Sequence, residues 1–331
     1  MIEENKIKEY IKSLNPEIFG ISKINSIELE KLPKGNWNYN FVVSINNKKF
    51  VFKIYSPDKE GFFTNSGKVE YKTLNYIQEL NIAPRPVVFD NTRSFFNNDI
   101  LVYEFIEGQR LSIFNKEIIK KIASSLAKLH CLNFNKINFL NKESEDPEIL
   151  LESSIKSYEE YNQREDAIKE YVIFLERIIK KLKKRKVIEI PHPYTIIHTD
   201  LVGGNLIINK ENDLKLIDWQ APKISDPAFD IWIITNQLYN LWDLEKPMQE
   251  DEKKYFLEEY LRFREDRTLL ERIKIKEPLW LLAVLLYCLT RYTDFISGKI
   301  DIAEGREENF ERYKRTLDLG IKILNESLEM Q

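Results

Sequence analysis

The chain has 331 residues, of which 43% are hydrophobic and 31% charged, and its formal net charge is −3. This length is enough for two lobes or domains, and this composition supports a sizeable core and excludes a disordered chain. Because the charge balance is slightly acidic, nothing attracts the protein generally to nucleic acid or to an anionic membrane, so we expect neither DNA nor a membrane as a partner.

The first hundred residues predict an antiparallel sheet with helices beside it. Apolar residues at helical spacing predict a short amphipathic helix over residues 3–14 and a second helix over residues 68–80. Runs of apolar and β-branched residues, separated by polar turns, predict strands before and after the second helix. We expect these strands near residues 24–29, 41–45, 50–55, 87–89 and 100–106.

Helical patterns dominate the remainder of the chain, and the region after residue 230 is also rich in aromatic residues. One predicted helix ends in a basic run, residues 180–186, which we interpret as a solvated helix end; a contact with RNA or phosphate is the alternative. The apolar stretch 279–289 is too short to cross a bilayer and predicts a buried helix. We expect the other helices over residues 118–129, 147–163, 165–186 and 306–328.

The two cysteines, Cys131 and Cys288, are too few for a disulfide framework and do not have metal-ligand spacing. The N-terminus is charged and polar and has no signal-peptide pattern. Both features favour a cytoplasmic location. The sequence leaves the oligomeric state open.

One stretch in the second half of the chain carries the strongest signal for chemistry. Two short apolar runs, residues 206–208 and 214–217, flank a turn-forming segment and predict a β-hairpin. Asn205 stands immediately before this hairpin and Asp218 immediately after it, so their side chains should lie close together, near the carboxylate of Asp200. Since Mg²⁺ prefers oxygen ligands and keeps several waters, a carboxylate and an amide are a suitable protein share of a magnesium site.

The pattern His198-x-Asp200-x-x-x-x-Asn205, with Asp218 after the hairpin, resembles the catalytic core of the aminoglycoside phosphotransferase and choline kinase family, in the protein-kinase-like superfamily. The resemblance implies that Asp200 accepts or orients the proton of an acceptor hydroxyl and that His198 braces its loop. Asn205 and Asp218 would hold Mg²⁺ on the phosphates of ATP or GTP. Asp230 would steady the catalytic loop by hydrogen bonds; the alternative is a helix-start carboxylate favoured by the helix dipole.

The resemblance covers most of the chain and also implies its fold. We expect an α+β, bilobal protein-kinase-like fold with nucleotide between the lobes. Residues 1–106 would form the N-terminal nucleotide-binding lobe, an antiparallel sheet with one helix. Residues 107–331 would form a mostly helical lobe that carries the catalytic residues and the acceptor site.

Nucleotide-binding roles in the N-terminal lobe follow from the same resemblance. Lys53, which lies between apolar neighbours on a strand, would contact the phosphates, and Glu70 in the following helix would form its ion pair. The alternatives are an exposed lysine on an edge strand and a helix-start glutamate. Gly35 would lie in a loop over the nucleotide, although this loop lacks a G-x-G-x-x-G pattern and could be an ordinary hairpin turn. Backbone groups near Glu104 and Ile106 would face the adenine edge.

The acceptor in the resembled family is a hydroxyl group. Only seven residues separate Asp218 from Asp226, which is too few for the peptide-docking segment of protein kinases. We therefore expect a small acceptor such as choline, ethanolamine, a sugar, homoserine or an aminoglycoside, with bacterial-type choline kinases the most similar. The aromatic helices after Asp230 would close its pocket, where rings can hold a cation. Two alternatives stay open: a kinase acting on a protein or RNA, and a non-catalytic nucleotide-binding scaffold.

Overall fold

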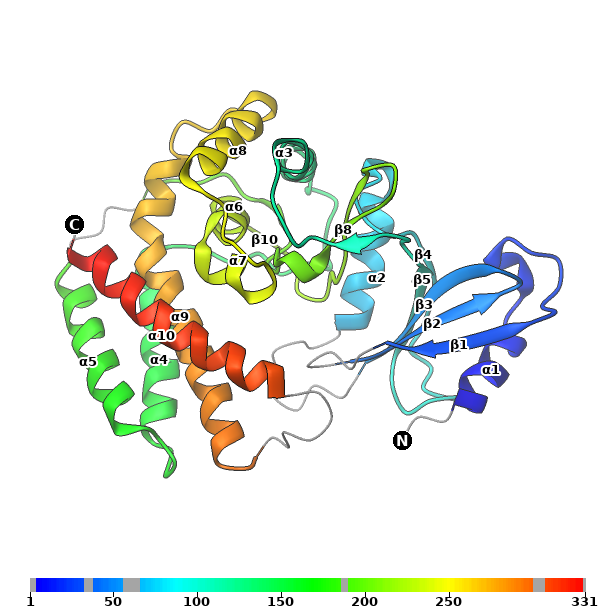
Figure 1. The fold of residues 1–331 in the computed structure, drawn as a ribbon, viewed down its shortest axis with the longest axis horizontal. Helices are drawn as coiled ribbons and strands as arrows, with labels where there is room; N and C mark the ends of the chain where they lie inside the picture. Colours follow the sequence, from blue (N-terminus) through cyan, green and yellow to red (C-terminus); the bar gives the residue numbers. More distant parts are fainter. Residues whose placement is uncertain (1–3, 33–37, 56–65, 186–189, 300–306, 330–331) are drawn as a thin grey trace.

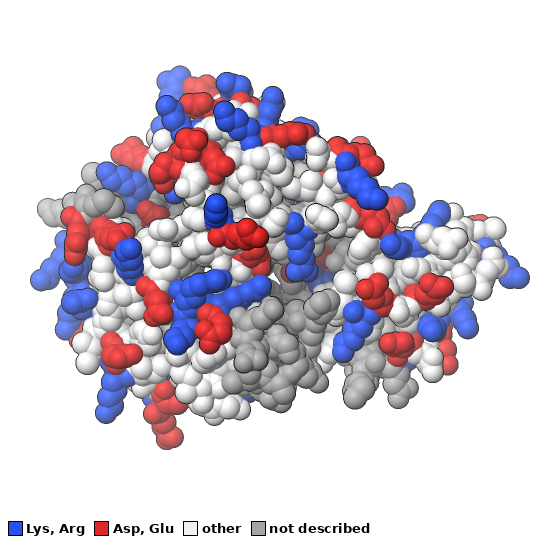
Figure 2. Space-filling model, in the orientation of Figure 1, with Lys and Arg blue, Asp and Glu red and all other residues white. Residues whose placement is uncertain are grey.

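The computed structural model describes residues 4–32, 38–55, 66–185, 190–299 and 307–329. A small sheet-based lobe stands beside a larger helical lobe, with α2 (Ser66–Ile77) next to their junction (Figure 1). On the face shown in Figure 2, basic and acidic side chains are interspersed, in keeping with the small net charge. The predicted α+β, two-lobed architecture is confirmed.

The N-terminal lobe is built on a five-stranded sheet in the order β1-β2-β3-β5-β4, in which all neighbouring strands are antiparallel. The predicted strands of this lobe are thereby confirmed. Asn46 and Asn47 form the two-residue turn between β2 and β3, and both have positive φ, as a type I′ hairpin requires. The strands are β1 (Ile27–Lys31), β2 (Tyr39–Ile45), β3 (Lys48–Ile54), β4 (Pro86–Asp90) and β5 (Ile100–Glu104).

Successive residues of these strands point to opposite faces of the sheet. On one face, Phe52 packs edge-on against Tyr10 of α1 (Glu4–Ser13), with ring centroids 5.7 Å apart. On the other face, Lys53 and Tyr55 reach α2 by hydrogen bonds. The predicted helix 3–14 thus covers the far face, and α2 lies on the face toward the helical lobe. The described residues of this lobe contain two α-helices, whereas the family resemblance implied one. Two short 3-10 helices complete this part: η1 (Pro16–Phe19) and η2 (Gln78–Leu80).

Eight helices in the described part of the C-terminal lobe surround one continuous apolar core. Capping residues determine where some of these helices begin. The Asn115 side chain accepts the Ile118 N–H at the start of α3. The Asp146 side chain accepts the Glu148 N–H at the start of α4, whose first residue is Pro147. The predicted helices of this lobe are confirmed. They are α3 (Lys116–His130), α4 (Pro147–Asn162), α5 (Lys169–Lys184), α6 (Ala228–Thr235), α7 (Gln237–Asp243), α8 (Glu250–Phe263), α9 (Leu269–Ile296) and α10 (Glu307–Glu329).

Two small sheets support the segments that the sequence marks for chemistry. One pairs β7 with β10, and the other joins β6, β8 and β9, of which β8 and β9 are the predicted hairpin. The short 3-10 helix η3 (Gly203–Asn205) leads into this hairpin. The strands are β6 (Gln109–Arg110), β7 (Thr195–Ile197), β8 (Leu206–Ile208), β9 (Leu214–Leu216) and β10 (Lys223–Ser225).

The apolar stretch 279–289 lies inside α9, a helix of 28 residues. By length and composition α9 could cross a membrane, so the argument that the stretch is too short does not hold. The burial of α9 indicates a helix inside the protein instead, because 56% of its most apolar 18 residues is buried and it packs against α4, α6 and α10. These properties are those of a core helix, and the prediction of a buried helix is confirmed.

Candidate active site

Lys53 of β3 connects the two lobes at the centre of the molecule. Its Nζ lies 2.7 Å from Glu70 Oε2 in α2 and 2.8 Å from Asp218 Oδ1 after β9. Lys53 is 2% and Glu70 1% exposed, so the predicted ion pair exists and is buried rather than on an edge. Burial would lower the pKa of Lys53, but the charges of Asp218 and Glu70 hold that pKa above its usual value.

Tyr55 is a member of this cluster that the sequence did not mark. Its hydroxyl donates to Glu70 Oε2 over 2.6 Å, and its ring centroid lies 5.2 Å from Lys53 Nζ. The two-residue period of a strand places Tyr55 on the same face as Lys53. That period was the available signal, because a tyrosine two residues beyond a buried lysine shares its surroundings.

The loop after β7 is held in place by Asp230 of α6. The two carboxylate oxygens of Asp230 accept the backbone N–H groups of His198 at 2.8 Å and Thr199 at 2.9 Å. Thr199 has φ of 73°, a left-handed conformation that is unfavourable for threonine and that the hydrogen bond to Asp230 stabilises. His130 Nε2 also lies 3.2 Å from Asp230. These contacts are the hydrogen bonds that the sequence predicts for Asp230.

His198 is a fully buried neutral imidazole within this loop. Its Nδ1 accepts the N–H of Asp200 at 3.2 Å, so the proton lies on Nε2, which donates to the Ile217 carbonyl at 3.0 Å. Burial lowers the pKa of His198, in agreement with the neutral form. His198 therefore connects the loop of Asp200 to the end of the hairpin, which is the bracing position the sequence predicts.

Asp200 and Asn205 face each other across the short loop that contains η3. Asn205 Nδ2 donates to the Asp200 backbone oxygen at 3.0 Å and to Asp200 Oδ2 at 2.9 Å. Burial and the charge of Asp218 raise the pKa of Asp200 to about 7, although the hydrogen bond from Asn205 opposes this shift. The carboxyl group can thus exchange a proton near neutral pH.

Asp218 presents one oxygen to the N-terminal lobe. Its Oδ1 accepts from Lys53 Nζ at 2.8 Å and from Gln220 Nε2 at 2.6 Å. Burial would raise the pKa of Asp218, but Lys53 and these hydrogen bonds hold it below its usual value, so the side chain is ionised.

The donor set fits a magnesium ion. The bonds described for Asp218 use Oδ1, and those described for the Asn205 side chain use Nδ2. Asp218 Oδ2 and Asn205 Oδ1 are therefore the hard oxygens that could hold a cation. Among the described residues no cluster of three or more His, Cys, Asp or Glu has metal-binding geometry. Mg²⁺ does not need such a cluster, because it takes one or two protein oxygens together with phosphates and waters.

Three predicted nucleotide-binding residues remain: Gly35, Glu104 and Ile106. Gly35 lies outside the described residues. The N–H of Glu104 donates to the Arg85 carbonyl at 2.9 Å, and its carboxylate pairs with the Arg85 guanidinium at 2.5 Å. Strand alternation puts this side chain on the face opposite Lys53, so only backbone atoms of Glu104 could serve the nucleotide. Ile106 follows two residues beyond the end of β5.

Asp243 of α7 is a second member of the site that the sequence did not mark. Its Oδ2 accepts the backbone N–H of Gly204 at 2.8 Å, and its charge contributes to the raised pKa of Asp200. A Cβ at Gly204 would stand 2.8 Å from that oxygen, so the close approach requires glycine. The Gly203-Gly204 pair was the signal in the sequence, but its partner lies 39 residues away.

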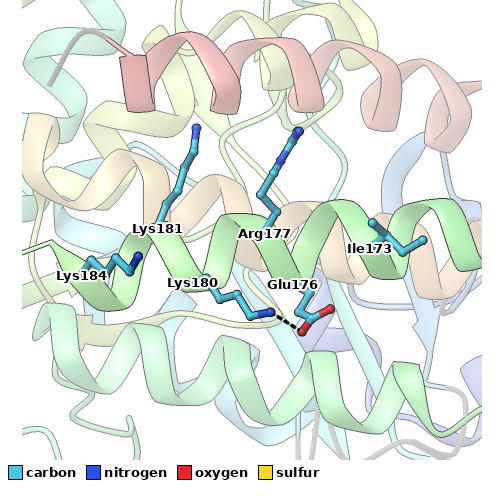
Figure 3. Close-up of a pocket in the computed structure, with 6 residues that line it drawn as sticks. All are labelled: Ile173, Glu176, Arg177, Lys180, Lys181 and Lys184. Carbon is cyan, nitrogen blue, oxygen red and sulfur yellow. Dashed lines mark ion pairs between the residues drawn. The ribbon is translucent and has the colours of Figure 1, made fainter.

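The basic run at the end of α5 lies apart from these residues. Lys180, Lys181 and Lys184 line an open groove with Arg177 (Figure 3), and Lys180 pairs with Glu176 at 2.7 Å. All four basic side chains are exposed. The interpretation of a solvated helix end therefore agrees with the structure.

A model of the phosphotransferase enzyme family matches residues 28–269, more than half of the chain. The chain belongs to this family. It is thus a phosphotransferase that acts on an alcohol group, and the resemblance drawn from the motif is confirmed. No curated protein sequence matches the chain.

Solved structures similar to this chain share its fold. The Plasmodium vivax ethanolamine kinase has a TM-score of 0.65 at 17% identity, covering 98% of this chain and 91% of its own. The choline kinase LicA from Streptococcus pneumoniae has a TM-score of 0.60 at 20% identity, covering 96% and 99%. A spectinomycin phosphotransferase in complex with ADP and spectinomycin has a TM-score of 0.61 at 16% identity, covering 96% and 98%. At these identities the similarity establishes the kinase-like fold.

Proposed function

We propose that this protein transfers the terminal phosphate of ATP to a hydroxyl group of a small molecule, with Asp200 as the catalytic base. The observation that carries the proposal is that three segments bring Lys53, Asp218 and the loop of Asp200 and Asn205 together: Lys53 Nζ lies 2.8 Å from Asp218 Oδ1, Asn205 Nδ2 lies 2.9 Å from Asp200 Oδ2, and the charge of Asp218 acts on Asp200. GTP remains the alternative donor. A structure with ATP and one with ADP are among those similar in fold to this chain.

Each residue of the site has a distinct part in this proposal. Lys53 offsets the negative charge of the phosphates, and Glu70 holds the lysine in position. Asn205 and Asp218 would hold Mg²⁺, which would supply positive charge against the phosphate that is transferred. Asp200 orients the acceptor hydroxyl and takes its proton, which a carboxyl group with a pKa near 7 does efficiently near neutral pH. His198 and Asp230 position the loop that carries Asp200.

A small acceptor fits the segment after Asp218 better than a protein does. Three of the seven residues before Asp226 form β10, which pairs with β7, so only residues 219–222 remain there, which are too few to dock a peptide. The slightly acidic net charge of the chain, −3, favours a cationic acceptor. We therefore favour an amino alcohol such as choline, and next an aminoglycoside or sugar.

The proposal also assigns the lobes and the compartment. Residues 1–106 form the nucleotide-binding lobe and residues 107–331 the catalytic and acceptor-binding lobe, with the boundary after the hinge strand β5. We place the protein in the cytoplasm, where ATP is available and where Cys131 and Cys288 would remain free thiols, as they are here.

A coupled assay of ADP or GDP release tests this function. Purified protein with Mg²⁺ and ATP or GTP is screened against amino alcohols, sugars, homoserine and aminoglycosides, and at least one acceptor should stimulate release. Asp218→Ala should abolish the metal-dependent turnover. Normal ADP production by that variant would refute the assignment, and transfer of labelled phosphate to protein or RNA but to no small molecule would favour the macromolecular alternative.

A further inference from the structure

We propose that Asn38 and Gln220 form an amide relay that ties the N-terminal lobe to Asp218, with Gln220 as a positioning residue for that carboxylate. Asn38 Nδ2 donates to Gln220 Oε1 over 2.6 Å, and Gln220 Nε2 donates to Asp218 Oδ1 over 2.6 Å. The two amides are 182 positions apart in the chain, so the relay spans the lobes. The inference rests on the proposed nucleotide site and deepens it by assigning two further residues.

The charge of Asp218 determines how both amides are oriented. An ionised carboxylate only accepts hydrogen bonds, so Gln220 must turn its Nε2 toward Asp218. In this orientation Gln220 Oε1 faces Asn38, so Asn38 must donate a hydrogen bond from its Nδ2. The relay therefore has one direction, from the N-terminal lobe to the carboxylate oxygen that also accepts from Lys53.

The relay and Lys53 act on the same oxygen of Asp218 from neighbouring strands. Asn38 immediately precedes β2, and its second neighbour Asn40 stands directly opposite Lys53 of β3 in the sheet. Asp218 Oδ1 is thus anchored to β3 directly and to the start of β2 through Gln220. Two hydrogen bonds to Oδ1 fix the rotation of the carboxylate, and Oδ2 would then be available to a cation.

Burial makes the relay sensitive to substitution. Asn38 is 5% exposed, and Gln220 is half-buried. A hydrogen bond from an amide to a charged group stabilises a folded protein more than a hydrogen bond between two neutral groups does. Removing the partner of a buried polar group is destabilising, because that group is left without a hydrogen bond. Loss of either amide should therefore weaken the positioning of Asp218.

The competing interpretation is that Gln220 is a cation ligand. In that arrangement Gln220 Oε1 would turn from Asn38 toward the metal, and Asn38 would contribute nothing to metal binding. The relay predicts instead that loss of Asn38 weakens metal binding as much as loss of Gln220 does, because the two amides act as one hydrogen-bonded unit. A double-mutant cycle separates the two.

Binding of ADP without turnover is the decisive measurement. Calorimetry gives Kd for Mg·ADP and for ADP in EDTA with wild type, Asn38→Ala, Gln220→Ala and the double variant. We expect each single change to weaken Mg·ADP binding about tenfold and the double change to weaken it no further, as expected for one shared hydrogen-bonded unit. Binding of metal-free ADP should change less than about threefold, because the relay acts through the metal-holding carboxylate.

A matched control breaks a different contact between the lobes. The hydroxyl of Tyr76 in α2 donates to the Asn133 carbonyl and touches neither Asp218 nor Gln220. Tyr76→Phe should leave the Mg·ADP affinity unchanged. If Gln220→Ala does not fold, as judged by its thermal midpoint, Gln220→Met keeps the volume of the side chain and should show the same loss of affinity.

Three outcomes would overturn the relay while wild type binds Mg·ADP: additive losses in the double variant, loss in Gln220→Ala but none in Asn38→Ala, or equal losses with and without metal. A wild-type protein that binds no Mg·ADP would instead overturn the proposed function, so the two failures are distinguishable.

Discussion

Burial, together with the nearby carboxylate of Asp218, controls the acid–base behaviour of Asp200. Burial and the charge of Asp218 favour the protonated form and raise its pKa from 3.8 to about 7. The hydrogen bond from Asn205 Nδ2 partly opposes them. A carboxyl group in this state is a much stronger base than an exposed aspartate and is still ionised in a large fraction of molecules at neutral pH.

The pH profile should therefore report Asp200. We expect kcat/KM for the nucleotide, which reflects groups of the free enzyme, to rise with pH and level off above about pH 7, because only the ionised carboxyl accepts a proton. Asp200→Asn should lower kcat by about 10²- to 10⁴-fold, and kcat/KM of this variant should no longer rise with pH up to about 7. A wild-type profile that is flat between about pH 5 and 9 would contradict the assignment.

The same pKa has a consequence for stability that provides a control for folding. Since the folded-state pKa lies above the unfolded value, the folded protein retains a proton that the unfolded chain releases, and stability falls as pH rises from about 4 to 7. Asp200→Asn removes this penalty. Its thermal midpoint should exceed that of wild type at pH 8 and match it near pH 4.

Tyr55 provides a second prediction at this scale. Tyr55→Phe removes the hydroxyl that donates to Glu70 Oε2 but keeps the ring beside Lys53. We expect a loss of about 1 kcal/mol in the free energy of unfolding and an increase of several-fold in KM for ATP, with kcat for the acceptor little changed. Urea unfolding and steady-state kinetics measure both; an unchanged KM for ATP would show that Glu70 holds Lys53 without Tyr55.

At the scale of elements, short polar segments determine where the strands of the N-terminal lobe turn. The Asn46-Asn47 turn was predictable because two turn formers stand between two apolar runs, and both residues adopt positive φ of 48° and 69°. The side chain of Asn46 also makes contacts with another segment of the chain. Asn46 bonds the backbone N–H of Asn25 and Ser26 and the carbonyl of Lys23, contacts that sequence spacing could not show.

Glycine substitutions in this turn should have opposite effects. Asn47→Gly keeps a conformation that glycine adopts without strain and should be neutral or stabilise by up to about 1 kcal/mol. Asn46→Gly gains the same freedom but loses three hydrogen bonds, so we expect destabilisation by about 1–3 kcal/mol. Thermal unfolding of the two variants compares them directly. Equal midpoints would mean that the Asn46 side chain does not contribute.

At the scale of the whole molecule, a buried ion cluster connects the catalytic segment to the long core helix α9. Asp226, between β10 and α6, accepts from Arg272 at 2.9 Å and from Lys276 at 2.8 Å. Asp226 and Arg272 are completely buried, and Lys276 is 2% exposed. The sequence marked Asp226 only by its distance from Asp218, because its two partners lie more than forty positions away.

Asp226→Asn should be strongly destabilising, because it removes the carboxylate that pairs with Lys276 and one of the two that pair with Arg272, the other being Asp266. We expect a loss of about 3–5 kcal/mol in the free energy of unfolding by urea. The control is Arg267→Ala, which breaks the exposed Arg267–Glu265 pair and should cost less than about 1 kcal/mol. Similar small losses in both variants would show that the cluster is not essential to the fold.

The sequence by itself determined the elements, the family and the principal site residues. Strands and helices follow from local periodicity and capping, as at Asn115, and Asp200, Asn205 and Asp218 share one short motif around one hairpin. Only the tertiary structure decided which distant side chains complete the site. Tyr55 contacts it from the end of β3, Asp243 contacts it from α7, and Asn38 reaches it through Gln220. A hydrogen bond between residues far apart leaves no spacing in a single sequence, so such partners become visible only when the chain is folded.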